Sequence, residues 1–163
     1  MQDLTIYLDE GTLNCRAAAI INHNGKILFH HNVAEPHYAL IGGRVQITES
    51  SDDTIKREIF EELGKEIELT GYICTVENFF KHNGKIFHEI MFVHSAEFKD
   101  EDDKKITNTI QNIEEAELKK GKHIQYEWID IDKLDDYQIR PAIIKKVLKN
   151  GKFPTHVINK EIK

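Results

Sequence analysis

The chain has 163 residues, of which 40% are hydrophobic and 31% charged, and its formal net charge is −6 at pH 7. This length suits one compact domain over residues 1–163 with a substantial core, and no apolar run approaches the roughly 20 residues that cross a bilayer. The acidic balance argues against non-specific nucleic-acid binding, which depends on neutralising phosphates. The acidic balance does not exclude nucleotides as substrates, because divalent cations can lie between an acidic site and a polyphosphate.

The N-terminus and the cysteines both favour a cytoplasmic protein without a membrane partner. The acidic start Met1-Gln2-Asp3 lacks the basic region of a signal sequence. Cys15 and Cys74 each lie in an apolar, strand-like run. We therefore expect two reduced core thiols rather than a disulfide.

In chain order, the first part of the sequence predicts strands that lead into a helix. Strands are expected at residues 4–8 (an edge strand), 16–22, 26–31 and 38–41. Asn24-Gly25 is a strong hairpin signal between the second and third of these. The run from Ser50 to Asp53 is typical of a helix start, and this helix should end at Gly64.

The second part predicts further strands, a charged loop and a last helix. Strands are expected at residues 68–80, 85–98 and 126–131, the last of these anchored in the core by Trp128. The charged stretch 99–122 is interpreted as a long loop with a helical turn near 114–119. An amphipathic helix should begin near Pro141. Strands interspersed with two helices indicate an α/β (α+β) fold, with a mixed β-sheet covered by helices.

The stretch from Gly42 to Lys65 carries the chemistry. On a helix, three carboxylates fall within about 100° of one face, those of Glu58, Glu61 and Glu62. A neighbouring apolar stripe, Ile55, Ile59 and Leu63, can pack on the sheet. Clustered carboxylates repel each other by roughly 0.2–0.5 kcal/mol per pair. An exposed acidic face is one interpretation; a site for a hard divalent cation is the other.

The same stretch resembles the signature of the Nudix (MutT-like) hydrolases, G-x5-E-x7-R-E-U-x-E-E-x-G-U, in which U is a bulky aliphatic residue. Every position of fixed identity is present at the right spacing: Gly43, Glu49, Arg57, Glu58, Glu61, Glu62 and Gly64. Ile59 supplies the first aliphatic position. Lys65 departs from the pattern at the last, and Ile41 stands where relatives often have proline. The Nudix box spans residues 43–65, and the order of strands extends the resemblance across most of the chain.

The resemblance implies a Nudix-type α/β/α sandwich and a magnesium-dependent hydrolase, with manganese as an alternative cation. Glu58, Glu61 and Glu62 would coordinate the metal with the backbone carbonyl of Gly42, and Arg57 and Glu49 would form a supporting ion pair. The metal would neutralise a diphosphate and activate a water. A later glutamate can serve as the base in some relatives. The candidates here are Glu114, Glu115, Glu117 and Glu127.

The resemblance also implies the substrate class, a small nucleotide such as a nucleoside triphosphate or a nucleoside diphosphate-linked compound, and it allows a homodimer. The chain lacks the sequence marks of the ADP-ribose and NADH subfamilies after the box, which favours a triphosphate or broad-specificity pyrophosphatase. The alternative is a catalytically silent nucleotide-binding or regulatory module. Arg16 and Arg44 are either phosphate contacts or exposed side chains, and Phe79-Phe80 is more typical of core than of a base-stacking site.

Overall fold

A computed structural model describes residues 2–105, 124–152 and 154–162. The chain forms a nine-stranded mixed sheet in the order β7-β3-β4-β2-β6-β5-β9, with β1 paired to β2 and β8 to β4. In chain order the elements are β1 (Thr5–Tyr7), β2 (Thr12–His23), β3 (Lys26–Asn32), β4 (His37–Arg44), α1 (Ser51–Leu63), β5 (Ile67–His82), β6 (Lys85–Phe98), η1 (Glu101–Lys105), β7 (Ile124–Asp130), η2 (Ile131–Asp136), β8 (Gln138–Arg140), α3 (Ile143–Asn150) and β9 (His156–Lys160).

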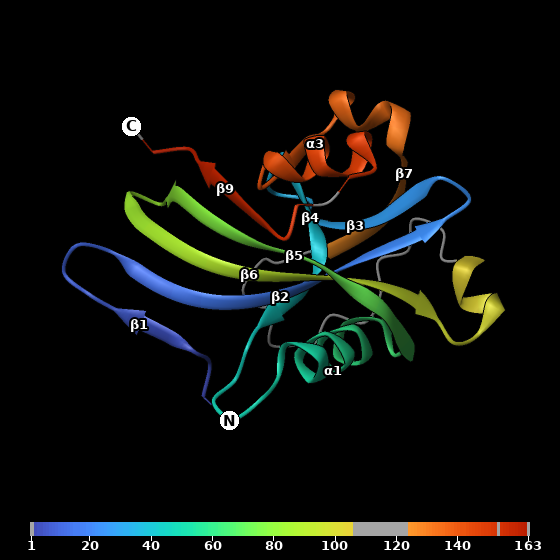
Figure 1. The fold of residues 1–163 in the computed structure, drawn as a ribbon, viewed down its shortest axis with the longest axis horizontal. Coiled ribbons are helices and arrows are strands. Elements are labelled where there is room, and N and C mark those ends of the chain that lie inside the picture. The colour runs from blue at the N-terminus through green and yellow to red at the C-terminus, as the bar shows by residue number, and fades with distance from the viewer. Residues whose placement is uncertain (1, 106–123, 153, 163) are drawn as a thin grey trace.

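Helices cover both faces of the sheet, with α1 below it and α3 above it in Figure 1. The α1-side core contains Ile55, Ile59 and Leu63 of the helix together with Ala17, Ala19 and Ile21 of β2. The α3-side core contains Ile144, Val147 and Leu148 together with Ala18 and Ile20. Alternate residues of β2 therefore enter opposite cores. This arrangement confirms the predicted α/β/α sandwich with a mixed sheet.

The turn and cap residues act as the sequence predicts. Asn24 and Gly25 have φ values of 51° and 77° between β2 and β3, and Asn83 and Gly84 repeat this between β5 and β6. Such positive φ angles suit the tight turns that join antiparallel strands. Ser50 caps α1 by accepting a hydrogen bond from the backbone N–H of Asp53, and Gly64 ends the helix in the left-handed conformation.

Several sequence expectations need correction or extension. The strand β7 is not the last, because β8 and β9 follow it and join β4 and β5 as parallel neighbours. Trp128 packs against the α1-side core but stays partly exposed. The helical turn expected near 114–119 lies outside the described residues. Cys15 and Cys74 are both free, as predicted, but only Cys74 is buried in the core and Cys15 is partly exposed.

The strand β4 positions the region that follows it. It pairs antiparallel with β2, with Gly42 opposite Ala18, Gly43 opposite Ala17 and Arg44 opposite Arg16. The chain then leaves the sheet and returns as α1, which packs over β4 and β2. The end of β4 therefore packs against α1. No helix in the described part of the chain has the length and apolar composition of a membrane span.

Candidate active site

Two glycines at the end of β4 let the backbone approach its neighbours closely. A Cβ on Gly42, whose φ is 151°, would lie 2.1 Å from the carbonyl oxygen of Ala17. A Cβ on Gly43 would lie 2.0 Å from the carboxyl carbon of Glu58. The Glu58 carboxylate therefore rests directly on the backbone of β4 at Gly43, and any larger residue at position 43 would displace it.

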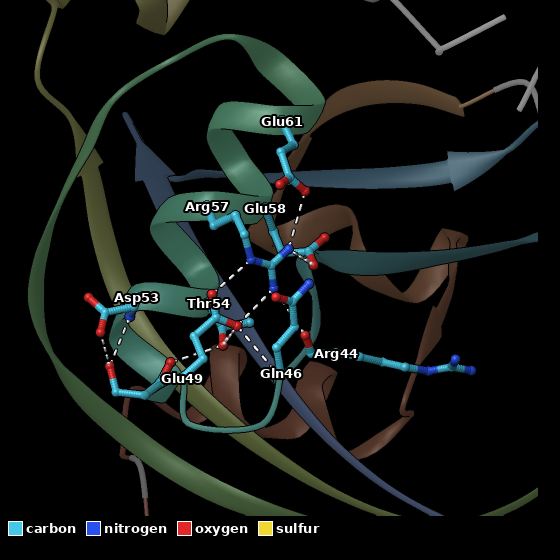
Figure 2. Close-up of polar contacts among 9 residues, drawn as sticks. Arg44, Gln46, Glu49, Asp53, Thr54, Arg57, Glu58 and Glu61 are labelled. Carbon is cyan, nitrogen blue, oxygen red and sulfur yellow. Dashed lines mark hydrogen bonds and ion pairs between the residues drawn. The ribbon is translucent and has the colours of Figure 1, made fainter. Parts of the chain in front are cut away.

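A two-point ion pair between Arg57 and Glu49 ties the loop after β4 to α1 (Figure 2). Nε and Nη2 of Arg57 donate to the two carboxylate oxygens of Glu49 at 2.8 and 2.9 Å. Glu49 also accepts from the hydroxyl of Thr54 at 2.8 Å and from the backbone N–H of Gln46 at 3.1 Å. These donors, with Arg57 first, lower the pKa of the Glu49 carboxyl to about 2.

The remaining donor of Arg57 reaches the acidic face of α1. Its Nη1 donates to Glu58 at 2.6 Å and to Glu61 at 3.2 Å. Burial, opposed by Arg57 and reinforced by the negative charges of Glu62 and Glu61, raises the pKa of Glu58. The three carboxylates thus lie close enough for their charges to interact, as their spacing predicts.

Glu62 faces a different set of partners, supplied by strands β3 and β7. The hydroxyl of Tyr126 donates to its carboxylate at 3.2 Å, and Nδ1 of His30 lies 3.6 Å from the same oxygen. His30 and Tyr126 sit opposite each other in the β3–β7 register. Sequence reasoning missed both residues, because only the pairing of strands nearly 100 positions apart brings them to α1.

The donor set at this site fits a hard divalent cation. Glu58, Glu61 and Glu62 offer carboxylate oxygens, the ligands that magnesium and manganese prefer. A cation would also offset the repulsion among these carboxylates, which adds to the larger effect of burial in raising the pKa of Glu58. Among the described residues no three acidic, histidine or cysteine side chains are already gathered as a metal cluster, so rotation of the glutamate side chains would have to complete the site. The carbonyl of Gly42 accepts from Arg16 Nη2 at 2.8 Å, which leaves it one further lone pair.

The four later glutamates suggested as bases divide into two groups. Glu114, Glu115 and Glu117 lie outside the described residues. Glu127 accepts hydrogen bonds from the hydroxyls of Tyr38 and Tyr137 at 3.0 and 3.1 Å, next to the α3-side core. Its neighbour Tyr126 points to the α1 side. Glu127 is therefore on the opposite face of the sheet from the α1 carboxylates, and this geometry does not support it as the base.

A pocket of about 280 Å³ opens on the α3 face of the sheet. Its floor includes Asn14, Asn78 and Glu89, and the stacked rings of Phe80 and Phe87 form part of its wall, with their centroids 5.0 Å apart. Four arginine or lysine side chains also line it, those of Arg16, Arg44, Lys81 and Arg140. The expectation that Phe79 and Phe80 are core residues is wrong, because both are only partly buried and Phe80 faces this pocket.

The end of β4 connects the pocket with the acidic face of α1. Gly43 contacts Glu58 on one side of the strand, whereas Arg44 lines the pocket on the other. Figure 2 shows the Arg44 side chain extending away from the Arg57 cluster. Arg16, also in the pocket, donates to the carbonyl of Gly42. An anionic group that bridges the strand end would therefore meet cations on the pocket side and carboxylates on the other.

This arrangement coincides with a family match across most of the chain. The model described as the NUDIX domain matches residues 13–150. This chain belongs to the Nudix family. The match confirms the predicted class of enzyme, a Nudix hydrolase that acts on phosphoanhydride bonds; Nudix hydrolases generally use divalent metal ions.

Solved structures share this Nudix fold at low sequence identity. The solution structure of the E. coli ORF135 protein is 24% identical, with a TM-score of 0.54 over 88% of this chain and 91% of that one. The MutT protein from Methanosarcina mazei Go1 is 20% identical, with a TM-score of 0.57 over 88% and 95%. An ADP-ribose pyrophosphatase from Streptococcus suis 89-1591 is 14% identical, with a TM-score of 0.59 over 88% and 97%. The likeness concerns the fold. A search of curated proteins finds no match.

Proposed function

We propose that this Nudix hydrolase is a magnesium-dependent pyrophosphohydrolase of nucleoside di- or triphosphates, or of compounds linked through a nucleoside diphosphate. Manganese is the expected alternative cation. The observation that carries the proposal is the end of β4, where the Glu58 carboxylate rests on Gly43 and a pocket lined by Arg16 and Arg44 lies on the other side. A diphosphate placed there has cations for its charge and carboxylates for its metal.

In this proposal each residue has a distinct task. Glu58, Glu61 and Glu62 hold the cation, and the Gly42 carbonyl is a further ligand. A bound divalent cation would neutralise the diphosphate and lower the pKa of a coordinated water. Arg57 and Glu49 are positioning residues, because their ion pair holds α1 against the loop after β4 and sets the place of Glu58.

A hydrolysis screen with product identification tests the proposal. Purified protein is incubated with ribonucleoside and deoxyribonucleoside triphosphates, ADP-ribose, UDP-glucose and a dinucleoside polyphosphate, in magnesium, in manganese and in EDTA. We expect metal-dependent release of pyrophosphate or of nucleoside monophosphate from at least one of them. Nucleotide binding without turnover in any condition would favour a silent binding module instead.

Paired variants test the metal site separately from the fold. Glu61→Gln and Glu62→Gln should each lower turnover by roughly two orders of magnitude or more, because a neutral amide replaces a ligand charge. The stabilisation of the wild type by magnesium, read as a rise in melting temperature, should also shrink in both. Glu66→Gln is the control, since its exposed carboxylate pairs with Lys99 beyond the end of α1. Near wild-type rates in both test variants contradict the ligand assignment.

A further inference from the structure

The floor of the α3-face pocket is a chain of buried amides that ends on a carboxylate. Asn159 Nδ2 donates to Asn78 Oδ1 at 2.8 Å, and Asn78 Nδ2 donates to Glu89 Oε1 at 3.0 Å. From the opposite side, Asn14 Nδ2 donates to Glu89 Oε2 at 3.3 Å. These side chains are at most 8% exposed. Strands β9, β5, β6 and β2 each supply one residue, so the sheet itself holds the network in place.

The direction of every hydrogen bond in this network follows from Glu89. An ionised carboxylate only accepts, so Asn14 and Asn78 must each turn an amide NH2 group toward it. Asn78 Oδ1 then faces Asn159, but Asn14 Oδ1 is buried and has no hydrogen-bond partner among the described residues. A buried acceptor without a donor is unfavourable. The network therefore lacks one donor on the side of Asn14.

The buried carboxylate of Glu89 has too few hydrogen-bond donors around it. It is 7% exposed, and within the described chain its hydrogen-bond partners are two neutral amides, with no lysine, arginine or histidine in an ion pair with it. A carboxylate has about four lone-pair positions, of which the amides use two. A buried charge without a cation is costly unless further donors reach it. Both Glu89 and Asn14 line the pocket, so a ligand can bring those donors.

The other residues of the pocket indicate the shape of a ligand that would fit it. The parallel rings of Phe80 and Phe87 differ by 9° in orientation and offer a flat apolar wall. Arg16 and Arg44 lie beside the two glycines at the end of β4. The volume of about 280 Å³ lies just below the roughly 300–1,000 Å³ of sites for drug-sized ligands. These dimensions suit one nucleobase with its sugar, the phosphates extending over β4.

We propose that Glu89 and Asn14 bind the amino group of the substrate's nucleobase, so that the enzyme selects amino-bearing bases (adenine, guanine or cytosine) over uracil and hypoxanthine. This inference rests on the proposed function for the position of the phosphates. An exocyclic amino group supplies two N–H donors, which match one free position on Glu89 and the unpartnered oxygen of Asn14. A keto oxygen at the same place directs lone pairs at a carboxylate and leaves Asn14 unsatisfied.

Nucleoside monophosphates test the pocket without requiring turnover. Titration calorimetry with CMP, UMP, AMP and IMP compares two pairs whose members differ chiefly in replacing an amino group with a keto group. We expect CMP or AMP to bind the wild type at least about tenfold more tightly than its keto partner, because a site built around a donor disfavours an analogue without it. The kcat/KM ratio of CTP to UTP, or of ATP to ITP, should show the same preference.

Two variants assign that preference to the network. Glu89→Gln should reduce the amino-to-keto ratio toward one, since the new amide presents a donor of its own. Asn14→Ala should also reduce it and serves as the second test if Glu89→Gln fails to fold. Glu77→Gln is the matched control, because this neighbouring carboxylate on β5 contacts His88 and His156 and does not line the pocket. It should keep the wild-type ratio.

The outcomes separate this inference from the proposed function. Hydrolysis of both members of a pair at equal kcat/KM, unchanged in Asn14→Ala, overturns the inference and leaves the hydrolase intact. Tighter binding of the amino-bearing monophosphate without hydrolysis of any compound in the nucleotide panel supports the pocket assignment and overturns the proposed function. Equal binding of the members of both pairs, or no binding of any of the four, overturns the inference.

Discussion

The ion pair between Arg57 and Glu49 makes a quantitative prediction about stability. The pKa of the Glu49 carboxyl falls from its ordinary value of 4.5 to about 2, and each pKa unit corresponds to about 1.4 kcal/mol. Ionised Glu49 therefore stabilises the folded state by about 3 kcal/mol at neutral pH relative to its protonated form. The side chain is only 9% exposed, so solvent screening reduces this figure little.

The perturbation is Glu49→Gln, which keeps the shape of the side chain and removes its charge. Because the folded-state pKa is depressed, the stabilisation is fully present above about pH 5 and is lost as the pH falls from 4.5 toward 2. Urea unfolding of wild type and variant should therefore differ by about 2–3 kcal/mol at pH 7. The difference should shrink steadily between pH 5 and pH 3.

The control for this series is Glu66→Gln, in which the carboxylate lost is exposed and pairs with Lys99 at the surface. Exposed pairs contribute little, so this variant should track the wild type at every pH. A difference below about 0.5 kcal/mol for Glu49→Gln at pH 7, or one that stays constant down to pH 3, would refute the reasoning.

Two further predictions concern the carboxylates and the excluded base. Gly43→Ala should lower turnover about a hundredfold or more and weaken stabilisation by magnesium, because its Cβ would lie 2.0 Å from the Glu58 carboxyl carbon; wild-type activity would show that Glu58 need not rest on this backbone. Glu127→Gln should retain turnover within about threefold, since its carboxylate lies on the face away from α1. A several-hundredfold loss of turnover in steady-state assays would make Glu127 a candidate base again.

The sequence alone determined the local parts of this protein. The caps of α1, the two Asn-Gly turns and the spacing of Glu58, Glu61 and Glu62 depend on residues within one helix or one turn. Backbone propensity and helical periodicity act over that range. The ion pair between Arg57 and Glu49 could also be predicted from the sequence, because a single motif contains both residues. These local features were enough to indicate the Nudix family.

Only the tertiary structure decided which distant residues share a surface. The short strand β9 carries a weak local signal, yet it supplies Asn159 to the pocket network. Likewise, Asn14 and Glu89 are 75 positions apart and meet because β2 and β6 pair in parallel with these two residues opposite each other. A slip of that register by one residue would send one of them to the opposite face. Strand pairing is non-local, so the floor of the pocket and the face that carries Glu127 follow from the assembled sheet and not from any single segment.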